Sequence, residues 1–173
     1  MAAPSAPQGR REALAEKVYL LWAGLAIGVA FLATPAKFLA PSLSLSAALD
    51  VGRYTFRVYN GAELALIVCL LVLGAWAHRR RRWYLGLLGP AAIVIAQAAW
   101  LLPALDLRVS AIQAGRAPPP SSLHTVYIAA EGLKVLWLLA MGLTGILSGA
   151  PSRAADLGGR IESAGPIRAQ WKA

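Results

Sequence analysis

The stretch SSLHTVYIAAEGLKVLWLLAMGLTGIL, residues 121–147, decides the fold of this chain. It is apolar and long enough to cross a membrane as a helix, since about 20 residues at 1.5 Å per residue span the ~30 Å hydrocarbon core. It also carries His124, Glu131 and Lys134, which are costly in lipid. The segment is therefore either not transmembrane, or it has a polar face that is turned away from lipid.

Three further apolar segments accompany it, at residues 18–40, 58–77 and 83–105. Of the 173 residues, 58% are hydrophobic and 14% are charged, whereas soluble domains are about half apolar and a quarter charged. Lipid requires a spanning segment to satisfy its own backbone hydrogen bonds, which an isolated strand does not do. The sequence therefore predicts an all-α integral membrane four-helix bundle in one domain at 17–149, with helices at about 18–40, 54–77, 83–105 and 122–148.

The two ends of the chain, residues 1–16 and 150–173, are rich in Ala, Gly, Pro and Ser and lack hydrophobic periodicity. They predict mostly disordered tails that leave room for a short helix at RREALAEK, residues 10–17. Basic residues precede the first apolar segment, as they do in a secretory signal. Its apolar run is longer than that of a signal, and no clean small-x-small cleavage site follows, so we expect a retained transmembrane helix.

Lys and Arg are unevenly divided between the two sides of the predicted bundle. Eleven lie in the N-terminal tail, the loop at 79–82 and the C-terminal tail, which share one side, and five lie on the other side. By the positive-inside rule, both termini are cytoplasmic. The Ala-, Arg- and Gly-rich composition suits a bacterial-type inner (plasma) membrane, with the lipid bilayer as partner. Because the net charge of +9 lies in tails and short loops beside apolar runs, nucleic-acid binding is excluded.

Polar residues of the predicted helices gather in the outer half or at mid-depth of the membrane. At 100° per residue, the polar side chains of the fourth segment fall within an arc of about 80°. The second segment carries a similar stripe, and the two are best buried against each other because a mid-bilayer charge costs at least about 2.5 kcal/mol. The predicted binding cluster, an outward-facing pocket, comprises Arg57, Asn60, Glu63, Gln97, His124, Tyr127, Glu131 and Lys134.

This cluster suits more than one function. A carrier or channel component for an ion, proton or small solute would use Glu63 and Glu131 as proton or cation acceptors, with Lys134 as counter-charge. Alternatively, the chain is a structural or accessory subunit whose polar stripes specify helix or partner packing, each contact contributing about 0.6 kcal/mol. An intramembrane metal enzyme is a third reading, because Glu63, Glu131 and His124 are acceptable ligand types, though without diagnostic spacing.

Absent motifs narrow the function classes further. The sequence has no Walker-type glycine loop, no Cys pair and no HExxH motif. Its single cysteine, Cys69, excludes an intramolecular disulfide and a multi-Cys metal site, and its apolar neighbours predict a buried side chain. His78 and His124 are predicted on opposite membrane faces, so they do not jointly bind a haem. No catalytic residue, cofactor or resident metal is predicted, and the sequence favours a non-enzyme without deciding it.

Small and aromatic residues indicate how the helices pack. Gly24-x-x-x-Gly28 and Gly145-x-x-x-Gly149 permit close helix approach and predict a homo-oligomer or a membrane partner. Prolines predict kinks or helix ends, at Pro35, Pro90 and Pro103. Aromatic residues near the expected membrane interfaces predict belt anchors, namely Trp22, Trp76, Trp83 and Tyr84.

Two motifs resemble a known family. GVAFLATPAKF, residues 28–38, and GRYTFRVYNGAEL, residues 52–64, are similar to the first two helices of the small four-helix membrane proteins of unknown function related to transmembrane protein 205. Those proteins have a Gly-x-x-Phe…Pro-x-x-Phe pattern, matched here by Gly28, Phe31, Pro35 and Phe38, and a second helix with a basic, aromatic start. The resemblance covers the first two helices. It implies a multi-pass membrane protein and carries over no activity or catalytic residue.

Overall fold

The computed structural model describes residues 6–75 and 80–163, which form helices and short connections and contain no strand. The first long helix joins α1 (Ala6–Ala26), the π segment η1 (Ile27–Ala33), α2 (Thr34–Ala36) and the 3-10 turn η2 (Lys37–Leu39). The second long helix is α3 (Leu45–Ala75). The third joins α4 (Arg80–Ala96), the π segment η3 (Gln97–Leu101) and α5 (Leu102–Gln113), and the fourth is α6 (Leu123–Ser163).

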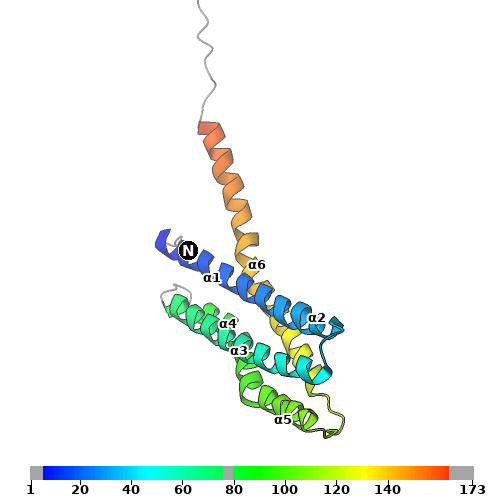
Figure 1. Cartoon of the computed structure of the whole chain (residues 1–173). Helices are drawn as coiled ribbons and strands as arrows, with labels where there is room; N and C mark the ends of the chain where they lie inside the picture. Colours follow the sequence, from blue (N-terminus) through cyan, green and yellow to red (C-terminus); the bar gives the residue numbers. More distant parts are fainter. Residues whose placement is uncertain (1–5, 76–79, 164–173) are drawn as a thin grey trace, which may run out of the picture.

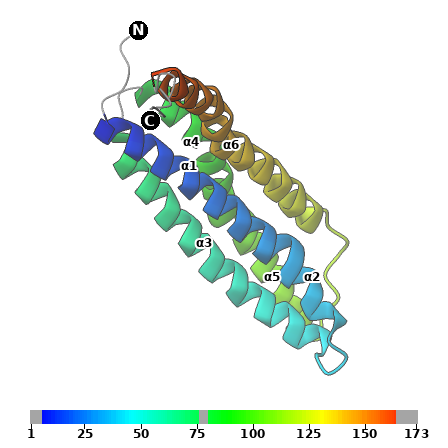
Figure 2. The same cartoon turned by 90° about the horizontal axis from the view of Figure 1, so that it is seen from above.

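The four long helices lie side by side and alternate in direction (Figure 1, Figure 2). The connections 40–44 and 114–122 share one end of the bundle, which we call the loop end. The start of α1 and the end of α3 lie at the opposite end, which we call the tail end. Side-chain contacts agree with this arrangement, because Arg53 near the start of α3 bonds to Ser110 near the end of α5.

The outside of the bundle is apolar. Large side chains such as Leu32, Val58 and Leu136 are 69%, 74% and 68% exposed, whereas a soluble bundle would turn such residues inward. Four helical stretches are long and apolar enough to cross a membrane: Arg10–Leu39, Leu45–Ala75, Trp83–Gln113 and Leu123–Thr144. The predicted all-α architecture of four membrane-compatible helices is confirmed.

Helix boundaries differ from the predicted ones. The first helix already begins at Ala6. It includes the short helix that was allowed at residues 10–17 and extends it, because Ala15 and Tyr19 pack into the core. The second begins at Leu45, nine residues early, where the Ser44 hydroxyl accepts a hydrogen bond from the Ala47 backbone N–H. The fourth continues to Ser163, so residues 150–163 are helical where a mostly disordered tail was predicted. Residues 1–5 and 164–173 of the predicted tails lie outside the described part.

Two of the three prolines are accommodated by π segments. A helical proline donates no hydrogen bond and its ring crowds the carbonyl four residues back. Before Pro35, the Thr34 backbone N–H and hydroxyl both bond to the Val29 carbonyl five residues back, the hydroxyl at 2.7 Å. Before Pro103, the Leu102 N–H bonds in the same register to Gln97. The third helix therefore continues past Pro103 to Gln113 and does not end near residue 105.

The core of the tail-end half is apolar. It is formed by buried residues of all four long helices: Ala15, Tyr19, Trp22, Ala23, Ile67, Leu70, Leu87, Val94 and Leu138. Trp22 is 0% exposed, so its predicted role as an interface anchor is wrong; its indole has a buried polar partner on α3. The predicted burial of Cys69 is also wrong, because this side chain is exposed on the apolar outside of the bundle.

Glycines let α4 and α6 approach closely. A Cβ atom added to Gly89 would lie 2.8 Å from the Trp137 ring, and one added to Gly86 would lie 2.7 Å from the Met141 sulfur. The Trp137 indole N–H also donates to the Gly86 carbonyl at 2.9 Å. The predicted Gly24 and Gly28 pair is different, because nothing lies within 4 Å of a Cβ added at either position. These two glycines do not serve packing within the bundle.

Candidate functional site

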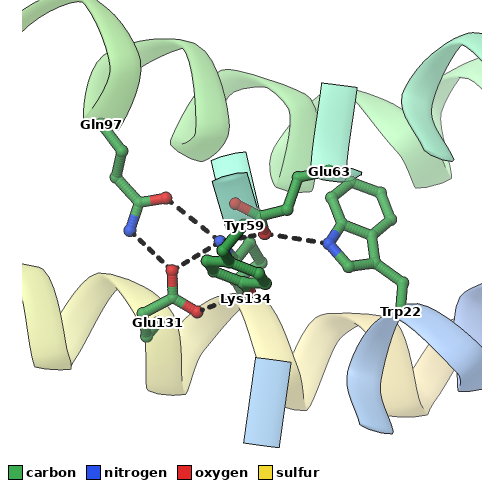
Figure 3. A network of polar contacts seen from close by, with 6 residues as sticks. All are labelled: Trp22, Tyr59, Glu63, Gln97, Glu131 and Lys134. Carbon is green, nitrogen blue, oxygen red and sulfur yellow. Dashed lines mark hydrogen bonds and ion pairs between the residues drawn. The ribbon is translucent and has the colours of Figure 1, made fainter. Parts of the chain in front are cut away.

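A buried polar network joins the four long helices of the bundle (Figure 3). Its members come from separate elements: Trp22 from α1, Tyr59 and Glu63 from α3, Gln97 from η3, and Glu131 and Lys134 from α6. Glu131 and Lys134 are three residues apart and therefore share one helix face. We call this set the central network.

Lys134 is the centre of this network. Its Nζ lies 2.5 Å from Glu63 Oε1 and 2.7 Å from Glu131 Oε1. It also donates a hydrogen bond of 3.1 Å to the side-chain oxygen of Gln97. A lysine ammonium has three N–H donors, so the three acceptors satisfy it completely. The ammonium is 0% exposed and would be very costly at this depth without them.

The two carboxylates have further donors. Glu63 Oε1 accepts a hydrogen bond of 2.9 Å from the Trp22 indole. Glu131 accepts from the Gln97 amide at 3.0 Å and from the Tyr59 hydroxyl at 3.2 Å. When both carboxylates are ionised, the network holds two negative charges and one positive charge. It therefore has the capacity for one proton or one additional cation.

Two pockets lie on the loop-end side of the network. The larger, which we call the loop-end pocket, has a volume of about 350 Å³ and lies among the first three long helices, with His124 from α6. The smaller, about 250 Å³, reaches the network directly, since Glu131 lines it together with Tyr127 and Phe31; we call it the Glu131 pocket. Four residues line both pockets, namely Thr34, Phe38, Phe56 and His124. The two pockets are therefore adjacent.

The loop-end pocket has charged walls. The side chain of Arg53 donates hydrogen bonds to Ser110 at 2.8 Å and to the Asp106 carbonyl at 3.0 Å. The Asp106 carboxylate lies 3.5 Å from Arg53 Nε and 3.2 Å from Arg57. Lys37 also lines this pocket, and its ammonium lies 5.1 Å from the centre of the Phe38 ring. Asn60 forms part of the same wall and is 9% exposed.

The eight predicted site residues divide between these places. Four of them, Glu63, Gln97, Glu131 and Lys134, meet in the central network. Three line the loop-end pocket, namely Arg57, Asn60 and His124. Tyr127 lines the Glu131 pocket, and its ring packs edge-on against Phe56 with centroids 4.9 Å apart. The predicted convergence of polar groups from several helices therefore describes two connected sites and not a single one.

Sequence reasoning missed four contributors. Tyr59 lies one helical turn before Glu63, and that spacing was a usable signal. Asp106 and Lys37 sit close to predicted helix ends, where charged residues are ordinarily solvated. Trp22 gave no signal at all, because an indole near one end of an apolar segment has the same appearance as an interface anchor.

The geometry does not support the hypothesis of an intramembrane metal enzyme. Among the described residues, no group of three His, Cys, Asp or Glu side chains is placed to hold a metal ion. Glu63, Glu131 and His124, the ligands considered from the sequence, do not form such a group. Searches of protein-family models, curated proteins and solved structures give no match to this chain.

Proposed function

We propose that this chain is a multi-pass protein of a bacterial-type inner membrane and acts as a carrier or channel component for an ion, proton or small solute. The distribution of Lys and Arg supports a cytoplasmic position for both termini. The loop end then faces outward, and the two pockets open from that side. Glu63 and Glu131 accept a proton or cation, with Lys134 as their counter-charge.

The observation that carries this proposal is the position of the pockets relative to the central network. The Glu131 pocket ends on a carboxylate that is bonded to Lys134 at the middle of the bundle. Beyond the network, the tail-end half is filled by packed apolar side chains such as Leu70 and Leu138. A solute site that reaches a charged network at mid-bundle from one end, with packed side chains beyond the network, fits the arrangement of an alternating-access carrier.

The π segments support the same function. η1 contributes Ala30 and Phe31 to the Glu131 pocket, and η3 contributes Gln97 to the network and Ala98 to the loop-end pocket. π turns inside helices are frequent at functional sites, and helices bend at them. Two of the helices around the site therefore have a point at which they can bend.

A structural or accessory role is the second candidate, and a specific observation favours it. Lys134 has a partner for each of its three N–H donors, and the network bonds to all four long helices. Buried polar contacts of this kind hold transmembrane helices together. If the role is structural, the pockets bind no solute and the network only specifies which helices pair.

Self-association is part of the proposal. Gly24 is exposed, and nothing lies within 4 Å of a Cβ added to Gly24 or Gly28, so this small-residue pair is free for a second copy or a membrane partner. Gly145 and Gly149 lie on α6, and their side-chain surroundings are outside the described part. Kinship with the family related to transmembrane protein 205 also remains a proposal, based on the two motifs in the first two helices.

Flux measurement separates the two candidates. Purified protein is reconstituted in liposomes with an entrapped pH dye, and gradients of sodium, potassium, chloride or benzoate are imposed. We expect proton-linked flux in wild type and at least about a tenfold loss of initial rate in Glu63→Gln and Glu131→Gln, since each removes an ionisable acceptor. Glu12→Gln, the same change outside the network, is the control and keeps the wild-type rate.

A structural role predicts the opposite results in the same experiment. Wild type moves none of these ions. Both glutamine variants lose thermal stability in detergent, because the only role of Glu63 and Glu131 is then to hold the helices together. That combination of results refutes the carrier proposal.

A further inference from the structure

The loop-end pocket contains more positive charge than its own carboxylate neutralises. Lys37, Arg53 and Arg57 line it, against the single carboxylate of Asp106. Both arginines are paired with that carboxylate, at 3.5 and 3.2 Å. Two positive charges therefore remain in excess. The Arg57 side chain is 63% exposed, so the costly unpaired charge is that of Lys37, which is half-buried beside the apolar bundle.

Lys37 is the cation without a counter-ion. Among the described residues, no carboxylate lies within ion-pair distance of its ammonium, and its nearest electrostatic contacts are the rings of Phe38 and Phe56 at 5.1 and 6.0 Å. The side chain passes over the backbone of Gly52, a position where a Cβ would collide with the Lys37 ammonium. Gly52 therefore gives Lys37 the space to turn toward the pocket.

Two buried donors in the same wall also lack hydrogen-bond acceptors. Within the described residues, the side-chain nitrogen of Asn60 and Nε of Arg53 are buried without a hydrogen-bond partner, although Nε of Arg53 lies 3.5 Å from the Asp106 carboxylate. Buried N–H groups are nearly always satisfied in folded proteins. The Asn60 amide and the Lys37 ammonium line the same pocket, and each could donate a hydrogen bond to an oxyanion.

The remaining walls are apolar. They are made by Leu49, Phe56, Leu102, Leu105 and Val109. The volume of about 350 Å³ is within the range of pockets that enclose a small organic molecule. A bare inorganic anion would leave these walls without contacts, whereas an anion with a hydrocarbon body would cover them.

We propose that the loop-end pocket binds a small organic carboxylate, with the carboxylate at Lys37, Arg53 and Asn60 and an apolar body against Phe56 and the aliphatic wall. This inference rests on the proposed function, since it names the class of solute that the pocket would present to the central network. It also selects an anion over a metal cation as the solute of this pocket.

Direct binding tests the inference with benzoate as probe and the full chain in a neutral detergent. Equilibrium dialysis compares radiolabelled benzoate with benzamide, which has the same body without charge, and with benzylammonium, which has the opposite charge. We expect saturable benzoate binding and at least about tenfold weaker binding of both analogues, because a charge-assisted hydrogen bond is lost or a repulsion gained. Equal binding of benzoate and benzamide would overturn the inference.

Lys37→Gln is the decisive variant. It should weaken benzoate binding at least about tenfold and leave thermal stability equal to or above that of wild type, since the ammonium has no carboxylate partner to lose. Arg116→Gln removes the same charge from an exposed loop position at the same end and should keep wild-type affinity. Unchanged binding in a stable Lys37→Gln protein contradicts the inference.

Two further experiments distinguish an organic carboxylate from inorganic phosphate and from a lipid headgroup as the bound anion. Inorganic phosphate should not displace benzoate, because it lacks an apolar body. The protein should bind benzoate equally well in nanodiscs of phosphatidylglycerol and of phosphatidylcholine. Weaker benzoate binding in phosphatidylglycerol would show that an anionic lipid headgroup occupies the pocket and would overturn the inference. Benzoate binding without any flux supports the pocket assignment and refutes the carrier, whereas cation flux without benzoate binding supports the carrier and refutes the anion.

Discussion

Lys134 is stable at the middle of the bundle only because three acceptors surround its ammonium. Lys134→Met fills a similar volume but leaves the carboxylates of Glu63 and Glu131 without a cation. Breaking a buried pair in this way costs about 3–5 kcal/mol, so the thermal midpoint in detergent should fall by several degrees or the protein should not be recovered folded. Lys17→Met, at an exposed position of α1, is the matched control and should unfold at the wild-type temperature.

Trp22 offers a milder test of the same network. Trp22→Phe keeps a buried aromatic ring and removes the indole N–H that bonds to Glu63. The acceptor still has Lys134, so we expect a loss of about 1–2 kcal/mol of unfolding free energy. Trp100→Phe, the same change at a side chain 59% exposed on the outside, should fall within about 0.5 kcal/mol of wild type. Equal losses of unfolding free energy in the two variants would contradict a stabilising hydrogen bond between Trp22 and Glu63.

At this scale, charged residues were easier to assign from sequence than aromatic ones. An ionisable side chain inside an apolar segment must find a partner, so Glu63, Glu131 and Lys134 could be grouped by depth and helix face alone. Trp22 and Tyr59 are tolerated both at interfaces and in cores, and only the packing of α1 and α3 decides between them. Their roles therefore required coordinates.

At the scale of the helices, the contact between α4 and α6 depends on glycine. Gly89→Ala would place a methyl group 2.8 Å from the Trp137 ring, so the helices must separate or the ring must move. We expect a loss of about 1–3 kcal/mol, the usual cost of overpacking. At Gly61, on the outside of α3, nothing lies within 4 Å of an added Cβ. Gly61→Ala should therefore stabilise the protein by up to about 1 kcal/mol through helix propensity, and a thermal unfolding comparison checks both signs.

Helix existence was predictable from sequence, whereas helix ends and π turns were not. Runs of about 20 apolar residues identify four spans regardless of context. The ends depend on contacts outside the runs, such as the Ser44 cap of α3 and the packing of Ala15 and Tyr19. Pro103 was a correct signal of irregular backbone, but the π register at Gln97–Leu101 lets the helix pass the proline and continue.

At the scale of the whole molecule, the proposed function depends on the orientation of the bundle in the membrane. Eleven of the basic residues are placed on the tail-end side by the sequence, so we expect a C-terminal green fluorescent protein fusion to fluoresce and a C-terminal alkaline phosphatase fusion to be inactive. An active phosphatase fusion would place the loop end in the cytoplasm and reverse the direction in which the pockets open.

The most direct measurement of the central claim is the access of water-soluble reagent to the loop-end pocket from outside the cell. Ala98 lines this pocket, and its neighbour Ala99 is at the same depth but exposed on the outside of the bundle. Single cysteines are placed at these positions in a Cys69→Ala background and treated with a membrane-impermeant thiol reagent on intact cells. We predict rapid labelling of Ala98→Cys and none of Ala99→Cys, which faces lipid. No labelling at Ala98, or equal labelling of both, would contradict an outward-open pocket above the central network.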